Sequence, residues 1–156
     1  MPPDISQSVH LDIWSDIVCP FCFIGQQHLR LALAPFQAAH PEVSVTIQWR
    51  SFELDPQAPP SDPRSMNEIL SQKYGRSPSE TQSMMDNTRA MASAAGLQMN
   101  LEGVKRINTF DLHRLLHFAH EHQLQDALKA AFMHAYFVDN LDLSQPEVIV
   151  TQVASV

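Results

Sequence analysis

Both cysteines of the 156-residue chain lie in one short stretch, "SDIVCPFCFIG", where Pro20 and Phe21 separate Cys19 from Cys22. Two thiols at this spacing are compatible with three roles. They can exchange electrons with another disulfide, supply half of a tetrahedral zinc site, or pack as small apolar side chains. The elements that surround the pair must discriminate between these roles.

The surrounding residues favour thiol–disulfide exchange. An alternating apolar run predicts a strand over residues 9–17, and residues 20–39 are predicted to form a helix. Cys19 then lies at the N-terminus of that helix, where unpaired N–H groups and the helix dipole lower the pKa of a thiol. Pro20 suits the first helical position because its missing N–H costs nothing there. We therefore predict Cys19 as the nucleophile and Cys22, one turn further on and more buried, as the resolving thiol.

A zinc site would need ligands beyond the two cysteines, and the chain's eight histidines are the candidates. His113, His117 and His120 fall on one stripe of a predicted helix. That stripe lies opposite the apolar face, so we expect it to be solvated rather than to bind metal. The long separation between these histidines and the cysteines matches no compact zinc module. A non-enzymatic metal-binding module and a purely packed cysteine pair remain as alternatives.

A parallel βαβ unit is predicted to position the cysteines. A second alternating run over residues 43–49 predicts the second strand, and the helix between the strands is long enough for a right-handed crossover. Pro35 interrupts the helical pattern and predicts a kink or a split at that point. We expect Trp14 and Trp49 to lie in or beside the sheet, as core residues.

The rest of the chain is predicted to be helical after a connector marked by four prolines between residues 52 and 63. The predicted N-caps of these helices are Ser65, Ser77 or Ser79, Asn108 and Ser144. We therefore divide the chain into an N-terminal βαβ portion, residues 1–60, and a mostly helical portion, residues 61–156.

Composition excludes several classes of function. Hydrophobic residues make up 44% of the chain and charged residues 17%, as in globular domains. No apolar run reaches the roughly 20 residues that span a membrane. The net charge of −7 argues against a nucleic acid or an anionic membrane as partner. The N-terminal residues show neither a basic region nor an apolar run typical of a secretory signal, so we expect a cytoplasmic protein.

Four stretches resemble the FrnE-like branch of the DsbA family of thiol–disulfide oxidoreductases, which have a thioredoxin fold. They are "DIVCPFCFIG", "WRSFELDPQAPP", "NTFDLHRLLHFA" and "AFMHAYFVDNLDLS". The resemblance implies an α/β, thioredoxin-like βαβ unit followed by a helical insertion that caps the active-site face. It also implies dithiol chemistry on Cys19 and Cys22, protein or small-molecule thiols and disulfides as partners, and no dissociable cofactor.

The resemblance further implies where a partner binds. Pro20 and Phe21 adjoin the thiols, Asn108 begins an "NTFD" turn that borders the active-site groove, and His113 is a polar contact in that groove. The related kappa-class glutathione transferases and hydroxychromene-carboxylate isomerases usually lack the dithiol and bind glutathione. A glutathione-dependent transferase or isomerase, with glutathione as co-substrate, is therefore the alternative function.

The central dipeptide departs from the pattern of the family. It is Pro-Phe, where a periplasmic DsbA enzyme has Pro-His. Without an imidazole beside Cys19, the thiolate loses one stabilising group and depends on the helix N-terminus. We expect a reduction potential of about −200 to −270 mV rather than the about −120 mV of the most oxidising relative.

A second departure concerns the end of the family's fold. That fold finishes with a β-hairpin and a helix, preceded by a turn whose cis-proline faces the dithiol. None of the eleven prolines of the chain has such a place, so we expect these final elements to be missing and the chain to be truncated. The first strand would then present an unpaired edge through which two copies could form a homodimer.

Overall fold

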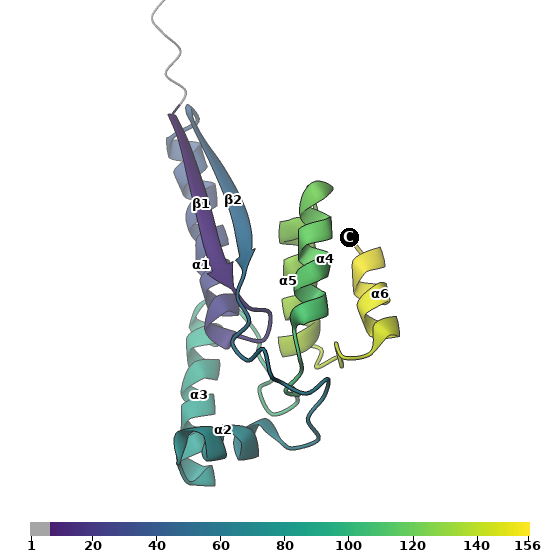
Figure 1. The fold of residues 1–156 in the computed structure, drawn as a ribbon. Helices are drawn as coiled ribbons and strands as arrows, with labels where there is room; N and C mark the ends of the chain where they lie inside the picture. Colours follow the sequence, from purple (N-terminus) through teal and green to yellow (C-terminus); the bar gives the residue numbers. More distant parts are fainter. Residues whose placement is uncertain (1–6) are drawn as a thin grey trace, which may run out of the picture.

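Two strands and six helices make up the part of the chain that the structure, a computed structural model, describes: residues 7–156. In chain order they are β1 (Gln7–Ser15), α1 (Pro20–Ala39), β2 (Val43–Ser51), α2 (Met66–Tyr74), α3 (Pro78–Ala94), α4 (Phe110–Glu121), α5 (Gln125–Phe137) and α6 (Pro146–Ala154). A βαβ unit thus precedes a series of helices, as predicted from the sequence (Figure 1).

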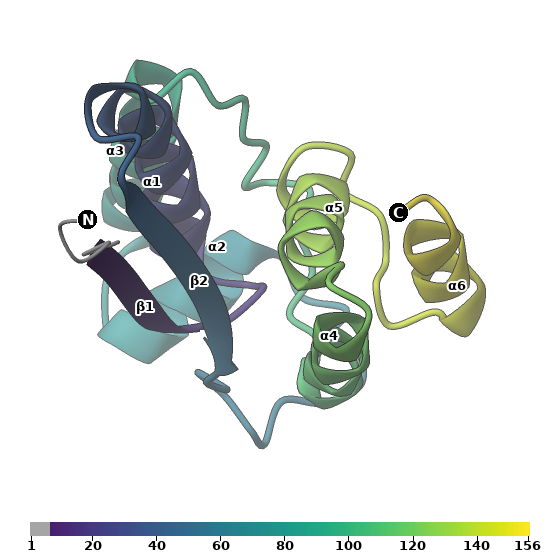
Figure 2. The ribbon, with the colours of Figure 1, turned by 90° about the horizontal axis from the view of Figure 1, so that it is seen from above.

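The two strands run parallel, with Gln7 opposite Val43 and Ser15 opposite Ser51. Parallel pairing requires a crossover, and α1 supplies it, lying against one face of the strands (Figures 1 and 2). Within the described residues β1 pairs only with β2, and a homodimer through its other edge stays a prediction. The core role expected of Trp14 is wrong: its side chain is 64% exposed, because it lies on the pleat opposite to that of Ile13.

Helix α1 runs without a break through Pro35, so the predicted split at this residue is wrong. The proline deletes one backbone donor, which is tolerated because it lies only four residues before the end of the helix at Ala39. This C-terminal half of α1 is largely exposed, whereas the buried residues Phe23 and Ile24 lie in the first turns. The end of the helix that carries the cysteines is therefore the end that is anchored.

Local sequence determines where α2 and α3 begin. Each starts with a capping box, in which a serine side chain accepts the N3 backbone N–H and the N3 glutamate accepts the serine N–H. The pairs are Ser65 with Glu68 and Ser77 with Glu80. The predicted caps at these two helices are confirmed, with Ser77 rather than Ser79 at the second.

The predicted caps of α4 and α6 are wrong by one residue. The N-cap positions are Thr109 and Gln145, and neither side chain caps its helix. Asn108 lies one residue before the N-cap of α4. Its side chain accepts the backbone N–H of Phe110, the first helical residue, at 2.9 Å. Ser144 donates to Asp142 and so turns away from the helix that follows it.

The buried core is mainly helical. It is formed by the first turns of α1 together with α3, α4, α5 and the loop between α3 and α4. Helix α6 lies outside α4 and α5 (Figure 2). Strand β2 joins this core through Trp49, whose backbone N–H and C=O both bond to the Gln125 side chain at 3.0 Å. Since both backbone groups are satisfied by one amide, α5 is held at a defined position beside the strand.

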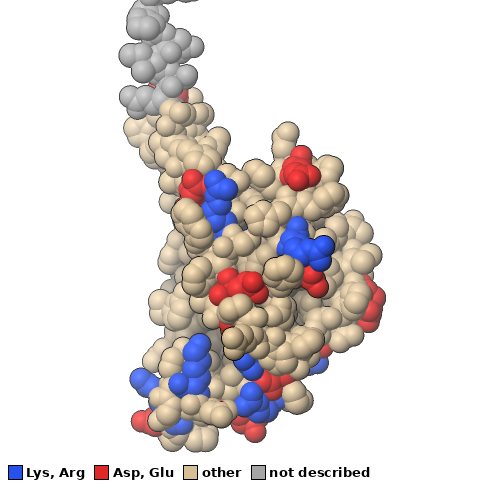
Figure 3. Space-filling model, viewed as in Figure 1, with Lys and Arg blue, Asp and Glu red and all other residues tan. Residues whose placement is uncertain are grey.

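Two surface properties bear on the expected partners. Within residues 7–156, no helix combines the length and the apolar character needed to cross a bilayer. On the face shown in Figure 3, lysine and arginine side chains are interspersed with aspartate and glutamate.

Candidate active site

The dithiol occupies the junction between β1 and α1. Cys19 is the N-cap of α1 with an extended backbone, and its Sγ accepts the backbone N–H of Cys22 at 3.3 Å. Pro20 takes the first helical position, as predicted. Both thiols are free and half-buried. The difference lies in their contacts, because Cys22 packs against the buried apolar cluster.

The two sulfurs share a hydrogen bond, and this couples their ionisation. The bond from the Cys19 thiol lowers the pKa of Cys22, and the Ser15 hydroxyl, the Asp16 backbone N–H and the Lys129 ammonium act in the same direction against burial. The same bond, followed by burial, raises the pKa of Cys19. The pair therefore loses its first proton at a low pH and its second at a high pH, and the lowered pKa belongs to Cys22 rather than to Cys19, opposite to the prediction from the helix N-terminus.

The other residues predicted to contact a partner have different surroundings. Phe21 is 57% exposed on the turn between the thiols. Asn108 donates to the carbonyls of Pro56 and Ala58, so its amide fixes the connector that follows β2. His113 is buried, and the expectation of a solvated histidine face is wrong for this residue.

The other two histidines of the stripe, His117 and His120, are exposed, as predicted, and both lie near side chains of the sheet. His117 shares a hydrogen bond with Ser51 at 2.9 Å, and His120 lies 3.3 Å from the Gln48 side-chain nitrogen. Both partners belong to β2, so these two side-chain hydrogen bonds link α4 to the strand at the surface. The described residues contain no group of three or more His, Cys, Asp or Glu side chains arranged to hold a metal ion.

A buried carboxylate, which the sequence analysis did not single out, lies three residues before Cys19. Asp16 is 1% exposed, and it accepts the backbone N–H groups of Ile17 and Leu54 at 2.8 Å each. His113 Nε2 completes the set at 3.0 Å. Asp16 thereby links the active-site turn to the segment after β2 and to α4.

A buried cation is the second feature that sequence analysis missed. Lys129 on α5 is 1% exposed, and its ammonium lies 4.9 Å from the centroid of the Trp49 ring. The charges of Cys22, Asp16 and Cys19 act on it, in that order of strength. One buried anion, Asp16, and one buried cation, Lys129, therefore belong to the electrostatic surroundings of the dithiol.

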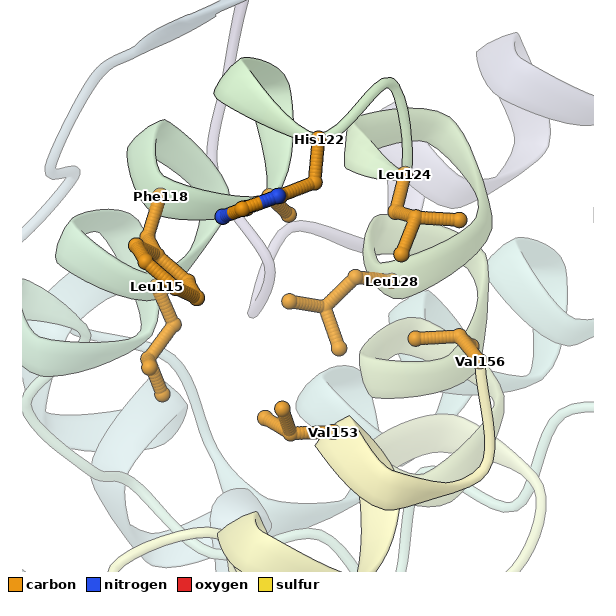
Figure 4. Close-up of a pocket in the computed structure, with 8 residues that line it drawn as sticks. Leu115, Phe118, His122, Leu124, Leu128, Val153 and Val156 are labelled. Carbon is orange, nitrogen blue, oxygen red and sulfur yellow. The ribbon is translucent and has the colours of Figure 1, made fainter.

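The apolar pocket where α4, α5 and α6 meet is separate from this chemistry (Figure 4). Its lining consists of Leu115, Phe118, Ala119, His122, Leu124, Leu128, Val153 and Val156. It includes neither cysteine and neither of the buried charged residues beside them. We therefore assign the candidate active site to the dithiol.

Comparison with known proteins agrees with this assignment. Residues 10–156 match the family described as the DSBA-like thioredoxin domain. The chain belongs to this family. The crystal structure of a probable DsbA oxidoreductase from Streptomyces coelicolor is similar, with a TM-score of 0.81 and 37% identity over 92% of this chain. The uncharacterised protein YwbO of Bacillus subtilis (strain 168) is 27% identical over 144 residues, or 91% of this chain.

Membership in the DSBA-like thioredoxin family confirms the resemblance and the α/β, thioredoxin-like fold inferred from the sequence. The chain spans 61% of the length of the Streptomyces structure and 63% of YwbO. The activity, substrates and partners of this DSBA-like chain are therefore treated below as proposals.

The buried Asp16 gives the DSBA-like domain a predicted dependence of stability on pH. Burial raises the pKa of this carboxyl, but the bonds from His113 and Leu54 outweigh it, and the pKa lies below the ordinary 3.8. A carboxyl with a lowered folded-state pKa contributes stability above its unfolded pKa and loses that contribution as the pH falls through the folded value. Acid should therefore weaken the wild type partly through Asp16.

We expect Asp16→Asn to lower the free energy of unfolding by about 1–3 kcal/mol at neutral pH, since a carboxylate that accepts buried donors is replaced. The difference from wild type should shrink as the pH falls below 3.8. Urea unfolding at a series of pH values measures both quantities. Asp111→Asn, at an exposed ion pair with Arg114, is the control and should cost less than about 1 kcal/mol. A difference that stays constant with pH would exclude Asp16 as the titrating group.

Proposed function

We propose that this chain is a thiol–disulfide oxidoreductase that exchanges its Cys19–Cys22 pair with disulfides or thiols of proteins and small molecules. Family membership supports the class of reaction. The observation that carries the assignment of residues is the position of Cys19, whose sulfur caps α1 and accepts a backbone N–H of the helix. No dissociable cofactor is needed, because both electrons move within sulfur–sulfur bonds.

The reaction has two balanced steps. The Cys19 thiolate attacks a partner disulfide R–S–S–R′, forming Cys19–S–S–R and releasing R′–S⁻. The Cys22 thiolate then attacks the Cys19 sulfur, forming the Cys19–Cys22 disulfide and releasing R–S⁻. The two protons of the original dithiol end on the released thiols. The partner gains two electrons, the dithiol loses two, and the reverse sequence reduces the chain.

The surroundings of the pair support separate roles for the thiols. Cys22 packs against the apolar cluster, whereas the sulfur of Cys19 caps α1. Phe21, exposed between them, offers an apolar contact to an incoming partner, and Pro20 shapes the same turn. Asn108 and His113 contribute indirectly, since their polar atoms bond to the connector and to Asp16.

The test is the equilibrium of the pair in buffers of reduced and oxidised glutathione, with the two thiols trapped by an alkylating reagent and counted by mass. We expect one reversible two-electron transition with a potential of about −200 to −270 mV. Thiols that never form the intramolecular disulfide at any glutathione ratio would contradict the proposal. Glutathione binding that persists after both cysteines are replaced by serine would favour the transferase or isomerase alternative.

A further inference from the structure

A small pocket lies between α1 and α5, and within the described chain it shares no lining residue with the pocket in Figure 4. Its volume is about 160 Å³, and its lining includes Phe23, Gln26 and Arg30 of α1, Leu97 of the loop after α3, and Ala130 and His134 of α5. Phe23 and Gln26 are buried, whereas Arg30 and His134 are exposed. This α1–α5 pocket therefore has an apolar interior that contains one amide, and a polar rim.

The amide of Gln26 is the unusual group of the α1–α5 pocket. Gln26 is 3% exposed, and its Nε2 is a buried donor with no hydrogen-bond partner among the described residues. Unpaired buried donors destabilise a fold and are rare in native structures. The adjacent Gln27 shows that the fold can satisfy an amide here, since its Nε2 donates to the Ala95 carbonyl at 3.2 Å. The donor of Gln26 thus has the properties of a group that serves a ligand rather than the fold.

Arg30 supplies the positive charge at the rim of the pocket. It lies one turn after Gln26 on α1, and residues at this spacing share one face of a helix. Arg30 is not among the arginines that form ion pairs within residues 7–156. On the α5 side His134 is paired with Asp139 at 3.0 Å, and the described lining residues include no carboxylate. The fixed charge that a ligand meets at this lining is therefore positive.

We propose that the α1–α5 pocket binds a small organic carboxylate that has an apolar body. One carboxylate oxygen accepts a charge-assisted hydrogen bond from the Arg30 guanidinium, and the other accepts from the Gln26 amide. The apolar body packs against Phe23, Leu97 and Ala130, which removes apolar surface from water. Because the volume is well below the roughly 300 Å³ at which drug-sized sites begin, the ligand is about the size of benzoate. Neither cysteine lines the pocket, so this binding is separate from the proposed thiol–disulfide exchange.

The test is an NMR titration of the reduced wild type with benzoate. We expect saturable shifts of the Gln26 side-chain amide signal and of the backbone signals of Phe23, Leu97 and Ala130. Benzyl alcohol has the ring without the charge, and acetate has the charge without the ring. Each should bind about tenfold more weakly than benzoate, because each lacks one of the two kinds of contact. No redox partner is present, so the result is independent of the glutathione equilibrium.

Two positions assign the contacts to residues. Arg30→Met should weaken benzoate binding about tenfold, and Arg30→Lys should restore part of the loss because it keeps the charge. Gln26→Met should weaken binding about three- to tenfold. Without benzoate it should unfold at a urea concentration no lower than wild type, because an unpaired buried donor has been removed. Arg76→Met, at an exposed arginine just after α2, is the matched control and should bind benzoate like wild type.

A Gln26 amide signal that does not move with benzoate would overturn the proposal, as would shifts that fall on the α4–α5–α6 pocket instead. Benzyl alcohol that binds as tightly as benzoate, or Arg30→Met that binds like wild type, would exclude a carboxylate site. A Gln26→Met protein that unfolds at a markedly lower urea concentration would show that the amide serves the fold. Since Arg30 is exposed, its variants test the site even where Gln26→Met does not fold.

Discussion

Cys22→Ser is expected to accumulate one covalently bound partner per chain, and Cys19→Ser none. With oxidised glutathione as the partner, Cys19 attacks one sulfur and forms Cys19–S–S–glutathione while one glutathione thiolate departs. Without Cys22 no internal thiol can resolve that bond, and the adduct persists. Catalytic turnover should fall to the uncatalysed background in both variants. Mass spectrometry of the intact chain under non-reducing conditions measures the adduct.

The two variants together identify the nucleophile. The pKa of Cys22 is lowered and that of Cys19 is raised, so the ionisation of the free pair does not select Cys19 as the nucleophile. The assignment rests on contacts instead, because the Cys19 sulfur caps the helix whereas Cys22 packs against the apolar cluster. An adduct that forms on Cys22 in the Cys19→Ser protein at the wild-type rate would reverse the assignment. The double variant, which has no thiol, is the blank for both.

The elements that carry the dithiol follow from local sequence. Strand alternation, the proline after Cys19 and two capping boxes are patterns within a few residues, and each corresponds to a local backbone geometry. Pro35 shows the limit of such rules. A single lost hydrogen bond near the end of a long helix is a small penalty that the rest of the helix tolerates.

The faces of the elements were less predictable than the elements themselves. Periodicity correctly grouped His113, His117 and His120, but it carries no information on what covers that group. In the fold His117 and His120 are exposed and hydrogen-bond to side chains of β2, whereas His113 is buried and reaches the carboxylate of Asp16.

Lys129 is a charged residue at a position where the helical pattern of the sequence predicts an apolar one. It shares the spacing of Phe132, Met133 and Tyr136, which form the buried stripe of α5. A lysine on an apolar stripe indicates either an error in the assigned face or a buried charge with a function. The Trp49 ring that the ammonium contacts is distant in the chain, so only the fold reveals what the charge faces.

Phe137→Ala is expected to be the most destabilising single change on α5 near the dithiol. The Phe137 ring is 1% exposed and stacks on Phe23 of α1, with centroids 5.4 Å apart and planes inclined by 11°. Truncating a buried phenylalanine leaves a cavity and costs about 3–5 kcal/mol. That is a large part of the about 5–15 kcal/mol that stabilises a typical domain. Urea unfolding measures the loss, and Phe137→Leu should lose less because it refills part of the cavity.

Phe118→Ala on α4 is the matched control, since this ring is 56% exposed, and it should cost less than about 1 kcal/mol. Phe23 directly follows Cys22, so the cavity left by Phe137→Ala lies next to the resolving thiol. We therefore expect faster alkylation of Cys22 in that variant than in Phe118→Ala, at urea concentrations far below unfolding. Equal stabilities for the two variants would mean that α1 is anchored by contacts other than the Phe23–Phe137 stack. The buried environment of Cys22 would then depend on Ser15, Asp16 and Lys129 rather than on aromatic packing.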